Sequence, residues 1–384
     1  MLGCLQWVSI QYYSDNVERF MKKILIVGLP FFAEKYTYMM DSYSSIGVHP
    51  RVLINSDYVG YGSDFDMHFA GKGTFSRMYN YAKTIRTYNP DFIDCYDYSI
   101  LSLYYVFVAK VLGVKVRFWL IGGELKGDKT HFNRKSFFLS LFVNVKKVLT
   151  RQSLRLSDKI FAKEVHHLDS IKSIGEDLLA KVVSIYNCVP VEDNYHSRSK
   201  ISKDFIYANA VIESRNVKSL VEAFSSLKKN NFVFSASIFG FNSISNVVYG
   251  VRGESYSNDV LELYEELDIG DVVSVDGFIK DIGVELVKHK FFLFPAEVIL
   301  ANYALLEAMS HGLVPIIFPG DGYEKIITDG VNGIVAFDFD IYSALERALK
   351  LSEDDYAKMS EAAYRKIKTE FSLSHWSSKL LDTL

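Results

Sequence analysis

Apolar segments typical of buried strands alternate with helix-like segments along nearly the whole chain. The runs ILIV at 24–27 and FFLF at 291–294 are continuously apolar, which is typical of strands buried on both faces of a parallel sheet. Between such runs, apolar positions recur with the period of an amphipathic helix. This alternation predicts α/β units in which helices cover parallel sheets.

The predicted elements fall into two successive groups. In the first group we expect strands at 24–27, 49–54, 92–97, 115–121, 158–164 and 181–187, and helices at 34–46, 74–88, 99–113 and 133–156. In the second we expect strands at 205–210, 233–240, 271–278, 291–296 and 314–319, and helices at 216–229, 257–267 and 302–311. Two α/β units of similar size therefore follow one another.

Domain boundaries follow from this grouping. The chain is predicted to comprise a peripheral extension at 1–20, a first domain at 21–190, a polar linker at 191–204, a second domain at 205–365 and a C-terminal helix at 366–384. We expect this last helix to pack back on the first domain. Ligands of such folds bind at the carboxyl ends of the strands, which here predicts a cleft between the two domains.

Charge divides the chain in the same way. Residues 21–190 hold 23 Lys and Arg against 15 Asp and Glu, whereas residues 191–384 hold 19 against 29. The first half is therefore basic and the second acidic, which suggests different partners. Three scattered cysteines favour neither a disulfide framework nor a metal cluster and fit a cytoplasmic protein. No apolar run is long enough to predict a membrane span.

The segment FPAEVILANYALLEAMSHG at 294–312 holds the strongest candidate site. A strand ends before Pro295, and a loop leads to a helix that begins near Asn302. Free amides and the dipole at a helix start favour phosphate oxygens. Glu307 lies inside this helix, where its carboxylate could bind the two hydroxyls of a ribose. The alternative is that Glu307 is an ordinary solvated helix residue.

Residues 294–317 resemble the donor-site signature of family-four retaining glycosyltransferases of the GT-B fold, in which two Rossmann-like, doubly wound α/β domains face a central cleft. The shared pattern comprises Pro295, Leu306, Glu307, Ala308, Met309, Gly312 and Pro315. The segments GDGYEKIITDGVNGIV at 320–335, VSVDGFIKD at 273–281 and NVKSLVEAFSSL at 216–227 are similar to further parts of that family.

The resemblance implies a sugar transfer from a nucleotide-diphosphate donor to a glycan or lipid-linked acceptor, with retention of configuration and without metal or cofactor. It implies a hexosyltransferase that acts in surface polysaccharide assembly, and we expect UDP as the nucleotide of the sugar donor. The implied donor-binding residues are Asn209, Arg215, Gly240, Phe278, Ile279, Leu300, Ala301, Asn302, Tyr303 and Glu307. Among them, Phe278 and Ile279 would flank the base and Glu307 would hold the ribose.

The sequence departs from the family pattern at both ends of this site. The family's first glutamate falls on Ile299, and Glu297 lies two positions earlier. Either the loop takes another path that brings Glu297 to the sugar, or this contact is missing. The family's diphosphate-binding lysine is replaced by Arg215, and its arginine by Ala210. Arg215 can serve a phosphate, although a surface arginine at a helix start is the alternative.

The first domain offers a second group of candidates at the acceptor side. Where family members often carry a histidine, this chain has Gly122, Gly123 and Glu124. Glu124 could contact an acceptor hydroxyl, or the segment could be a simple turn. Gly28 faces the same cleft in the family. Together with Glu297, Glu124 is a candidate catalytic residue.

Residues 126–163 contain ten Lys and Arg and two Asp, interleaved with apolar residues. One interpretation is an amphipathic core helix with a solvated basic face. The other is a surface for anionic membrane lipids or a lipid diphosphate, which would make the protein peripheral on the cytoplasmic face of a membrane. No nucleic-acid motif accompanies the charge.

Two competing functions remain open from the sequence. Loss of the family's glutamate, arginine and histidine favours a catalytically impaired GT-B homologue that acts as a binding or partner subunit. An α/β dehydrogenase or epimerase is disfavoured because no G-x-G-x-x-G follows the first strand. The Asp-Phe-Asp triplets at 64–66 and 338–340 mimic a metal-binding motif of another glycosyltransferase architecture, and no metal is expected.

Overall fold

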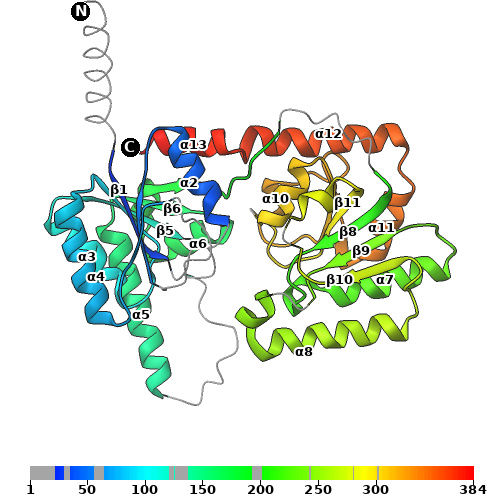
Figure 1. The fold of residues 1–384 in the computed structure, drawn as a ribbon, viewed down its shortest axis with the longest axis horizontal. Helices are drawn as coiled ribbons and strands as arrows, with labels where there is room; N and C mark the ends of the chain where they lie inside the picture. Colours follow the sequence, from blue (N-terminus) through cyan, green and yellow to red (C-terminus); the bar gives the residue numbers. More distant parts are fainter. Residues whose placement is uncertain are drawn as a thin grey trace, which may run out of the picture. The chain divides into compact units, whose positions relative to one another are not determined.

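The computed structural model describes residues 22–29, 35–55, 65–120, 125, 137–192, 201–241, 244–279, 281–300 and 302–384 (Figure 1). The chain divides into two compact units. The first comprises Met1–Ile185 together with Trp376–Leu384, and the second comprises Tyr186–His375. The predicted extension at 1–20 and residues 193–200 of the predicted linker lie outside the described residues.

The first unit is built on a seven-stranded sheet in the order β3-β2-β1-β4-β5-β6-β7, in which every neighbouring pair is parallel. The strands are β1 Ile24–Leu29, β2 Arg51–Ile54, β3 Met67–Phe69, β4 Phe92–Cys95, β5 Lys115–Leu120, β6 Lys159–Ala162 and β7 Val182–Ser184. The helices are α2 Lys35–Ser45, α3 Thr74–Tyr88, α4 Ser102–Val111, α5 Phe137–Leu156 and α6 Val165–Ile174.

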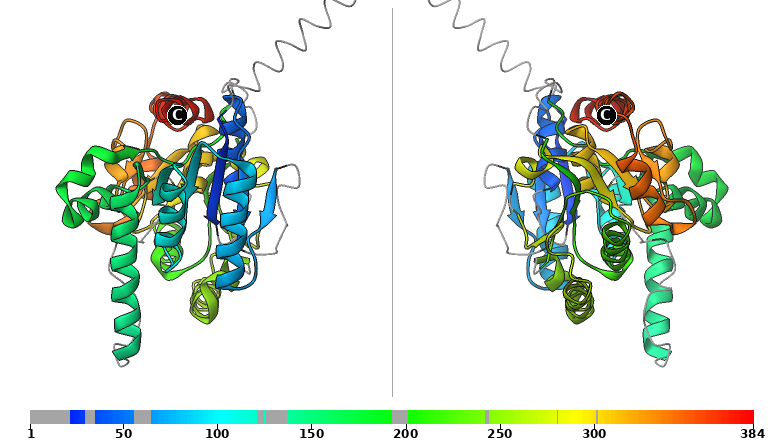
Figure 2. Two further views of the ribbon diagram at one scale, coloured as in Figure 1. Left: turned by 90° about the vertical axis from the view of Figure 1, so that its left-hand side faces the viewer. Right: turned by 90° about the vertical axis from the view of Figure 1, so that its right-hand side faces the viewer.

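Helices cover both faces of this first sheet. One face packs against buried residues of α3, α4, α5 and α6, such as Tyr81, Tyr105, Leu154 and Ile171. On the other face, Trp119 of β5 stacks on Trp376 from the C-terminal segment at a ring-centroid distance of 5.9 Å. Tyr43 of α2 meets the same Trp376 ring edge-on at 5.3 Å. Figure 2 shows α5 extending past the ends of its neighbours α3 and α4.

The second unit repeats the plan with a six-stranded parallel sheet in the order β10-β9-β8-β11-β12-β13. Its strands are β8 Lys203–Ala208, β9 Ala236–Phe239, β10 Val273–Asp276, β11 His289–Phe294, β12 Val314–Ile317 and β13 Ile334–Val335. Its helices are α7 Val217–Lys229, α8 Ile244–Glu266, α9 Gly283–Leu286, α10 Tyr303–Ser310, α11 Ile341–Leu349 and α12 Glu353–Glu370, with α13 Leu373–Leu381 crossing the unit boundary.

The predicted class, two Rossmann-like α/β units with parallel sheets, is confirmed. The strand order reverses between β1 and β4 in the first sheet and between β8 and β11 in the second. Open α/β sheets bind ligands at such reversal points, outside the carboxyl ends of the strands. The short edge strands β3 and β13 were not predicted, and α8 begins at Ile244 rather than near residue 257.

An ion pair lies buried in the middle of the first unit. Asp94 of β4 and Arg117 of β5 are paired across neighbouring strands, and both side chains are at most 1% exposed. Arg117 donates from Nε to Oδ1 at 2.5 Å and from Nη2 to Oδ2 at 2.8 Å. The Tyr43 hydroxyl also donates to Asp94. Because removing one partner leaves a buried charge without its counter-ion, this pair ties β4, β5 and α2 together.

We therefore expect Asp94→Ala to lower the free energy of unfolding of this unit by about 3–5 kcal/mol, measured by urea denaturation. As a matched control, Lys110→Ala removes one partner of the exposed Lys110–Asp158 pair and is expected to change stability by at most about 1 kcal/mol. Equal effects of the two substitutions would show that the buried pair has no special role.

Candidate functional site

Most of the predicted donor-site residues lie at one edge of the second sheet. The strands β8, β9, β10, β11 and β12 are all parallel, so the segments that follow them leave from the same side. Those segments carry the predicted residues Asn209, Gly240, Phe278, Ile279, Arg215, Glu297, Leu300 and Asn302. The fold thus gathers groups from four separate loops along the carboxyl edge of one sheet.

Gly240, which directly follows β9, allows the loops after β8 and β9 to lie close together. Its φ is +116°, and a Cβ built on it would lie 1.9 Å from the carbonyl oxygen of Asn209. Any larger residue would push the loops after β8 and β9 apart. The amide of Gly240 also donates to the carbonyl of Asp276 at 3.2 Å, which links the loop carrying Phe278 to the same place.

Asn209 connects the loop after β8 to the start of α10. Its Nδ2 donates to Oδ1 of Asn302 at 3.3 Å, and its own Oδ1 accepts from the amide of Ala210 at 2.8 Å. Asn302 is the N-cap of α10, since its Oδ1 accepts from the amide of Ala304 at 3.1 Å. An anion at this helix start would compete with Asn302 for that amide.

Arg215 is a cation without a counter-ion among the described residues of this edge. Its Cζ lies 4.9 Å from the ring centroid of Phe294, the last residue of β11. Its Nε is buried and makes no hydrogen bond, and none of the described carboxylates pairs with it. A buried donor without a partner is costly unless an acceptor binds. The arrangement therefore favours an anion beside Arg215.

Two contacts hold the Arg215 turn against the end of β11. Asn216, in the left-handed conformation with φ of 50°, donates from Nδ2 to the carbonyl of Pro295 at 2.9 Å. The amide of Glu297 donates to the carbonyl of Ser214 at 3.3 Å. Glu297 and Arg215 therefore lie on neighbouring loops, although 81 residues lie between them in the sequence.

The loop after β11 decides which residue can present a carboxylate. Ile299, at the position of the family's first glutamate, is fully buried, whereas Glu297 is exposed. Leu300 is also buried, and its side chain fills the space beside Gly322. The carbonyl of Glu297 accepts from the amide of Asp321 at 2.8 Å, which fixes this loop against the segment after β12.

Glu307 and the base-flanking residues complete the described part of the site. Glu307 is half-buried in α10, with the buried residues Leu306 and Ala308 on either side. Tyr303 is the first residue of that helix and is also half-buried. Phe278 is 61% exposed directly after β10 and could present its ring to a planar ligand. Ile279 beside it is half-buried.

The predicted residues Glu124, Gly122, Gly123 and Ala301 lie outside the described residues. Gly28 lies in β1 with φ of +87°, and a Cβ there would come within 2.5 Å of Asp97. Sequence reasoning missed Asp97, which follows β4 at the reversal point of the first sheet. Burial raises the pKa of its carboxyl group. The only local sign of Asp97 in the sequence is the Asp-x-Ser spacing. In this turn, Oδ1 of Asp97 accepts from the amide of Ser99 at 2.6 Å.

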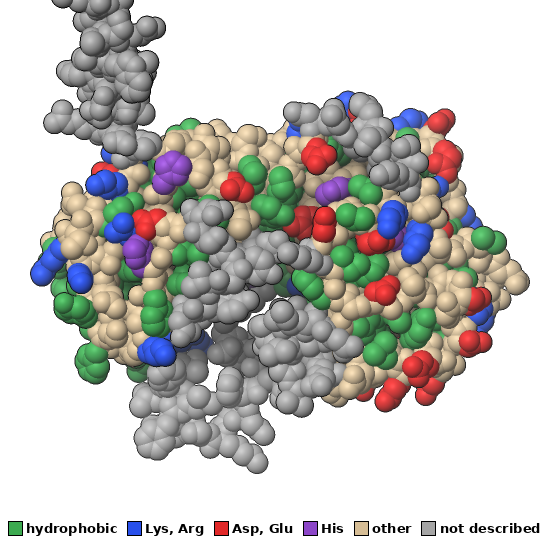
Figure 3. All heavy atoms as spheres, viewed as in Figure 1, with side chains coloured by type: hydrophobic (Ala, Val, Ile, Leu, Met, Phe, Trp, Pro, Cys, Tyr) green, Lys and Arg blue, Asp and Glu red, His purple; other side chains and the backbone are tan. Residues whose placement is uncertain are grey.

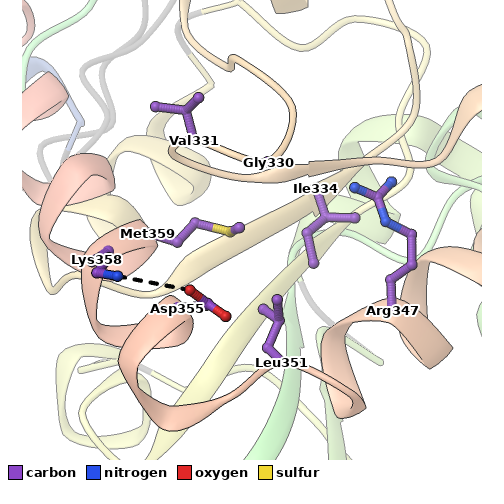
Figure 4. Close-up of a pocket in the computed structure, with 8 residues that line it drawn as sticks. All are labelled: Gly330, Val331, Ile334, Arg347, Leu351, Asp355, Lys358 and Met359. Carbon is purple, nitrogen blue, oxygen red and sulfur yellow. Dashed lines mark ion pairs between the residues drawn. The ribbon is translucent and has the colours of Figure 1, made fainter.

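A separate small cavity of about 250 Å³ lies in the second unit, by the edge strand β13 (Figure 4). Arg347 at its rim is bonded to Asp329, and Lys358 faces Asp355 at 3.9 Å. Its charged groups are thus already paired within the unit. The predicted donor-site residues do not line this cavity. Within the described ranges, no cluster of three or more His, Cys, Asp or Glu could hold a metal ion.

We expect Gly240→Ala to destabilise the second unit and to displace Asn209, because the new methyl group collides with backbone rather than with a flexible side chain. Thermal unfolding should show a clear loss of melting temperature. Gly330→Ala is the matched control, since Gly330 also has a positive φ of +72° but open space around its Cβ position. Equal losses for both variants would mean that φ strain, and not the close approach, sets the effect.

Solved structures similar to this chain share its fold. A glycosyltransferase from Rickettsia africae matches with a TM-score of 0.71 at 17% identity, covering 95% of this chain and 98% of its own. Anabaena HepE in complex with UDP matches with 0.71 at 12% identity, covering 94% and 99%. The lipopolysaccharide outer core galactosyltransferase WaaB matches with 0.66 at 16% identity, covering 94% and 100%. A comparison with curated proteins found no significant match.

None of the described helices has the length and apolarity that crossing a membrane requires.

The family model of the glycosyl transferases group 1 matches residues 192–366, which span nearly the whole second unit and every described candidate of the donor site. The GT-B fold expected from the sequence is thereby confirmed, and residues 192–366 match the glycosyl transferases group 1.

Proposed function

We propose that the chain transfers a hexose from a nucleotide-diphosphate donor to a glycan or lipid-linked acceptor. The observation that carries this proposal is Arg215, a cation whose buried Nε has no partner, held at the carboxyl edge of the second sheet. A diphosphate supplies the acceptor atoms that this donor lacks, and arginine binds phosphate oxygens well.

The other groups of the edge fit the remaining parts of a nucleotide sugar. Glu307, carried over from the family pattern, binds the ribose hydroxyls, and the exposed ring of Phe278 flanks the base. The start of α10 at Asn302 adds amides and the positive end of the helix dipole. Similar structures support a uridine nucleotide, since HepE was solved with UDP and with UDP-glucose.

Further similar structures support a glycan acceptor. WaaG is described as a glycosyltransferase of lipopolysaccharide biosynthesis, with a TM-score of 0.64 at 14% identity. TarM was solved with fondaparinux, a glycosylated glycerol and UDP. One neighbour of the fold thus acts in lipopolysaccharide biosynthesis, and another binds glycosides together with UDP. We extend this class of acceptor, and surface polysaccharide assembly as the setting, to this chain as part of the proposal.

In the proposed reaction the bond between the sugar and the diphosphate breaks while an acceptor hydroxyl bonds to the same carbon. Arg215 and the first-turn amides of α10 stabilise the negative charge that collects on the leaving diphosphate. Glu297, exposed on the neighbouring loop, is the proposed sugar contact, and Glu124 the proposed acceptor contact. Retention of configuration without a metal ion is proposed from the family resemblance.

One observation favours a second candidate function, an impaired homologue that binds a nucleotide or a partner without turnover. The position of the family's first glutamate is Ile299, which is fully buried, and the arginine position is Ala210, which is 9% exposed. Neither can contact a charged donor. Such a protein would keep nucleotide binding through Arg215 and Glu307 but would not release sugar.

We expect one of UDP, GDP, ADP and CMP to bind at micromolar strength in calorimetry. Arg215→Ala and Glu307→Ala should each weaken that binding tenfold or more, which corresponds to about 1.4 kcal/mol. As matched controls, Arg365→Ala and Glu361→Ala remove an exposed pair on α12 and should leave the affinity unchanged.

Turnover then separates the two candidate functions. Release of nucleoside diphosphate from the matching nucleotide sugar would support the transferase, whereas binding without release would support the impaired homologue. If no nucleotide binds, or if the substitutions at Arg215 and Glu307 are silent, the donor site proposed at this edge does not exist.

A further inference from the structure

Three neighbouring helices of the first unit, α3, α4 and α5, form a layer that contains no acidic residue. Tyr104 of α4 donates from its hydroxyl to the carbonyl of Met78 in α3 at 3.0 Å, and Ser153 of α5 bonds to Ser102 of α4 at 3.2 Å. Their basic residues are Arg77, Lys83, Arg86, Lys110, Lys146, Lys147, Arg151 and Arg155. We call the outer side of this layer the α3–α5 face.

Large apolar side chains share this face with the basic ones. On α3, Phe75 is 87% exposed and Tyr79 is 67% exposed. On α4, Phe107 and Val111 are 57% and 67% exposed. Each pair is four residues apart, so both members lie on the same side of their helix. Such apolar groups on a solvent-facing surface mark an interaction site rather than a core.

An open apolar groove of about 510 Å³ runs between α4 and α5 on the same unit. It is lined by Ile100, Leu103, Tyr104, Phe107, Leu149, Gln152 and Leu156. Only a glutamine and a tyrosine among these residues carry polar side-chain groups. The groove therefore has the chemistry to receive a hydrocarbon segment and little with which to bind a polar ligand.

The described middle of α5 is exposed on every side. Residues Asn144–Val148 are five consecutive exposed positions, more than one full helical turn. Within this turn Val145 and Val148 are apolar, while Lys146 and Lys147 carry positive charge. A helix that places apolar and basic groups together beyond its packed part resembles an interfacial helix more than a solvated one.

From these observations we propose that the α3–α5 face binds the surface of an anionic lipid bilayer. Lys146, Lys147 and Arg151 complement the headgroup charge, while Phe107, Val148 and the groove contact the acyl boundary. Charge favours this occupant: α3, α4 and α5 contain no acidic residue, and the carboxylate of Asp158 after α5 is paired with Lys110 at 2.8 Å. This proposal does not depend on the nucleotide site of the second unit.

The test is co-sedimentation of the full chain with vesicles of phosphatidylcholine, with or without about one third phosphatidylglycerol. We expect binding to the anionic vesicles to exceed binding to the neutral ones at least about tenfold, and to fall as salt is raised. Lys146→Glu combined with Lys147→Glu should reduce binding to anionic vesicles about tenfold. Phe107→Ser combined with Val148→Ser should also reduce it.

Matched controls carry the same changes on the second unit. Lys229→Glu with Lys358→Glu reverses two exposed charges, and Val233→Ser removes an apolar side chain that is 95% exposed. Circular dichroism checks that each variant is folded. The proposal is overturned if the wild-type protein does not bind anionic vesicles, or if the control variants lose binding to the same extent. A wild-type dimer that does not bind vesicles, and that dissociates on combining Phe107→Ser with Val148→Ser, would also overturn it.

Discussion

Parallel pairing of the strands in the second unit is the constraint on which the candidate site depends. Ala208 of β8 pairs in register with Phe239 of β9, so Asn209 and Gly240 leave the sheet together. Phe294 of β11 pairs with Ile317 of β12 in the same way, which sets the Glu297 loop beside the segment at Asp321. Because every strand runs in one direction, loops distant in sequence deliver their groups to one edge.

Two arginines show how the same side chain serves structure in one unit and, in our proposal, function in the other. Both lie over a phenylalanine ring, Arg117 at 4.9 Å from the centroid of Phe92 and Arg215 at 4.9 Å from that of Phe294. Arg117 is neutralised by Asp94 within the fold and has no capacity left for a ligand. Arg215 keeps a buried donor without a partner, which is the expected state of an anion site before its ligand binds.

The alternation of strands and helices could be predicted from the sequence because buried parallel strands are continuously apolar. It missed β3, in which two of the three residues are exposed, and the first half of α8, where Gly250 and Gly253 weaken the helix pattern. The resemblance supplied Arg215 and Glu307 as candidates, but not the unpaired Nε that distinguishes Arg215. The pairing of Asp94 with Arg117 and the position of Asp97 depend on strand register, which no local pattern specifies.

A crystal structure of the chain with UDP would test the central claim most directly, because it locates the diphosphate rather than only detecting it. The account predicts phosphate oxygens within hydrogen-bonding distance of Nε of Arg215 and beside the start of α10, with the ribose at Glu307. Density for UDP at another place, or an empty carboxyl edge at saturating nucleotide, would contradict it.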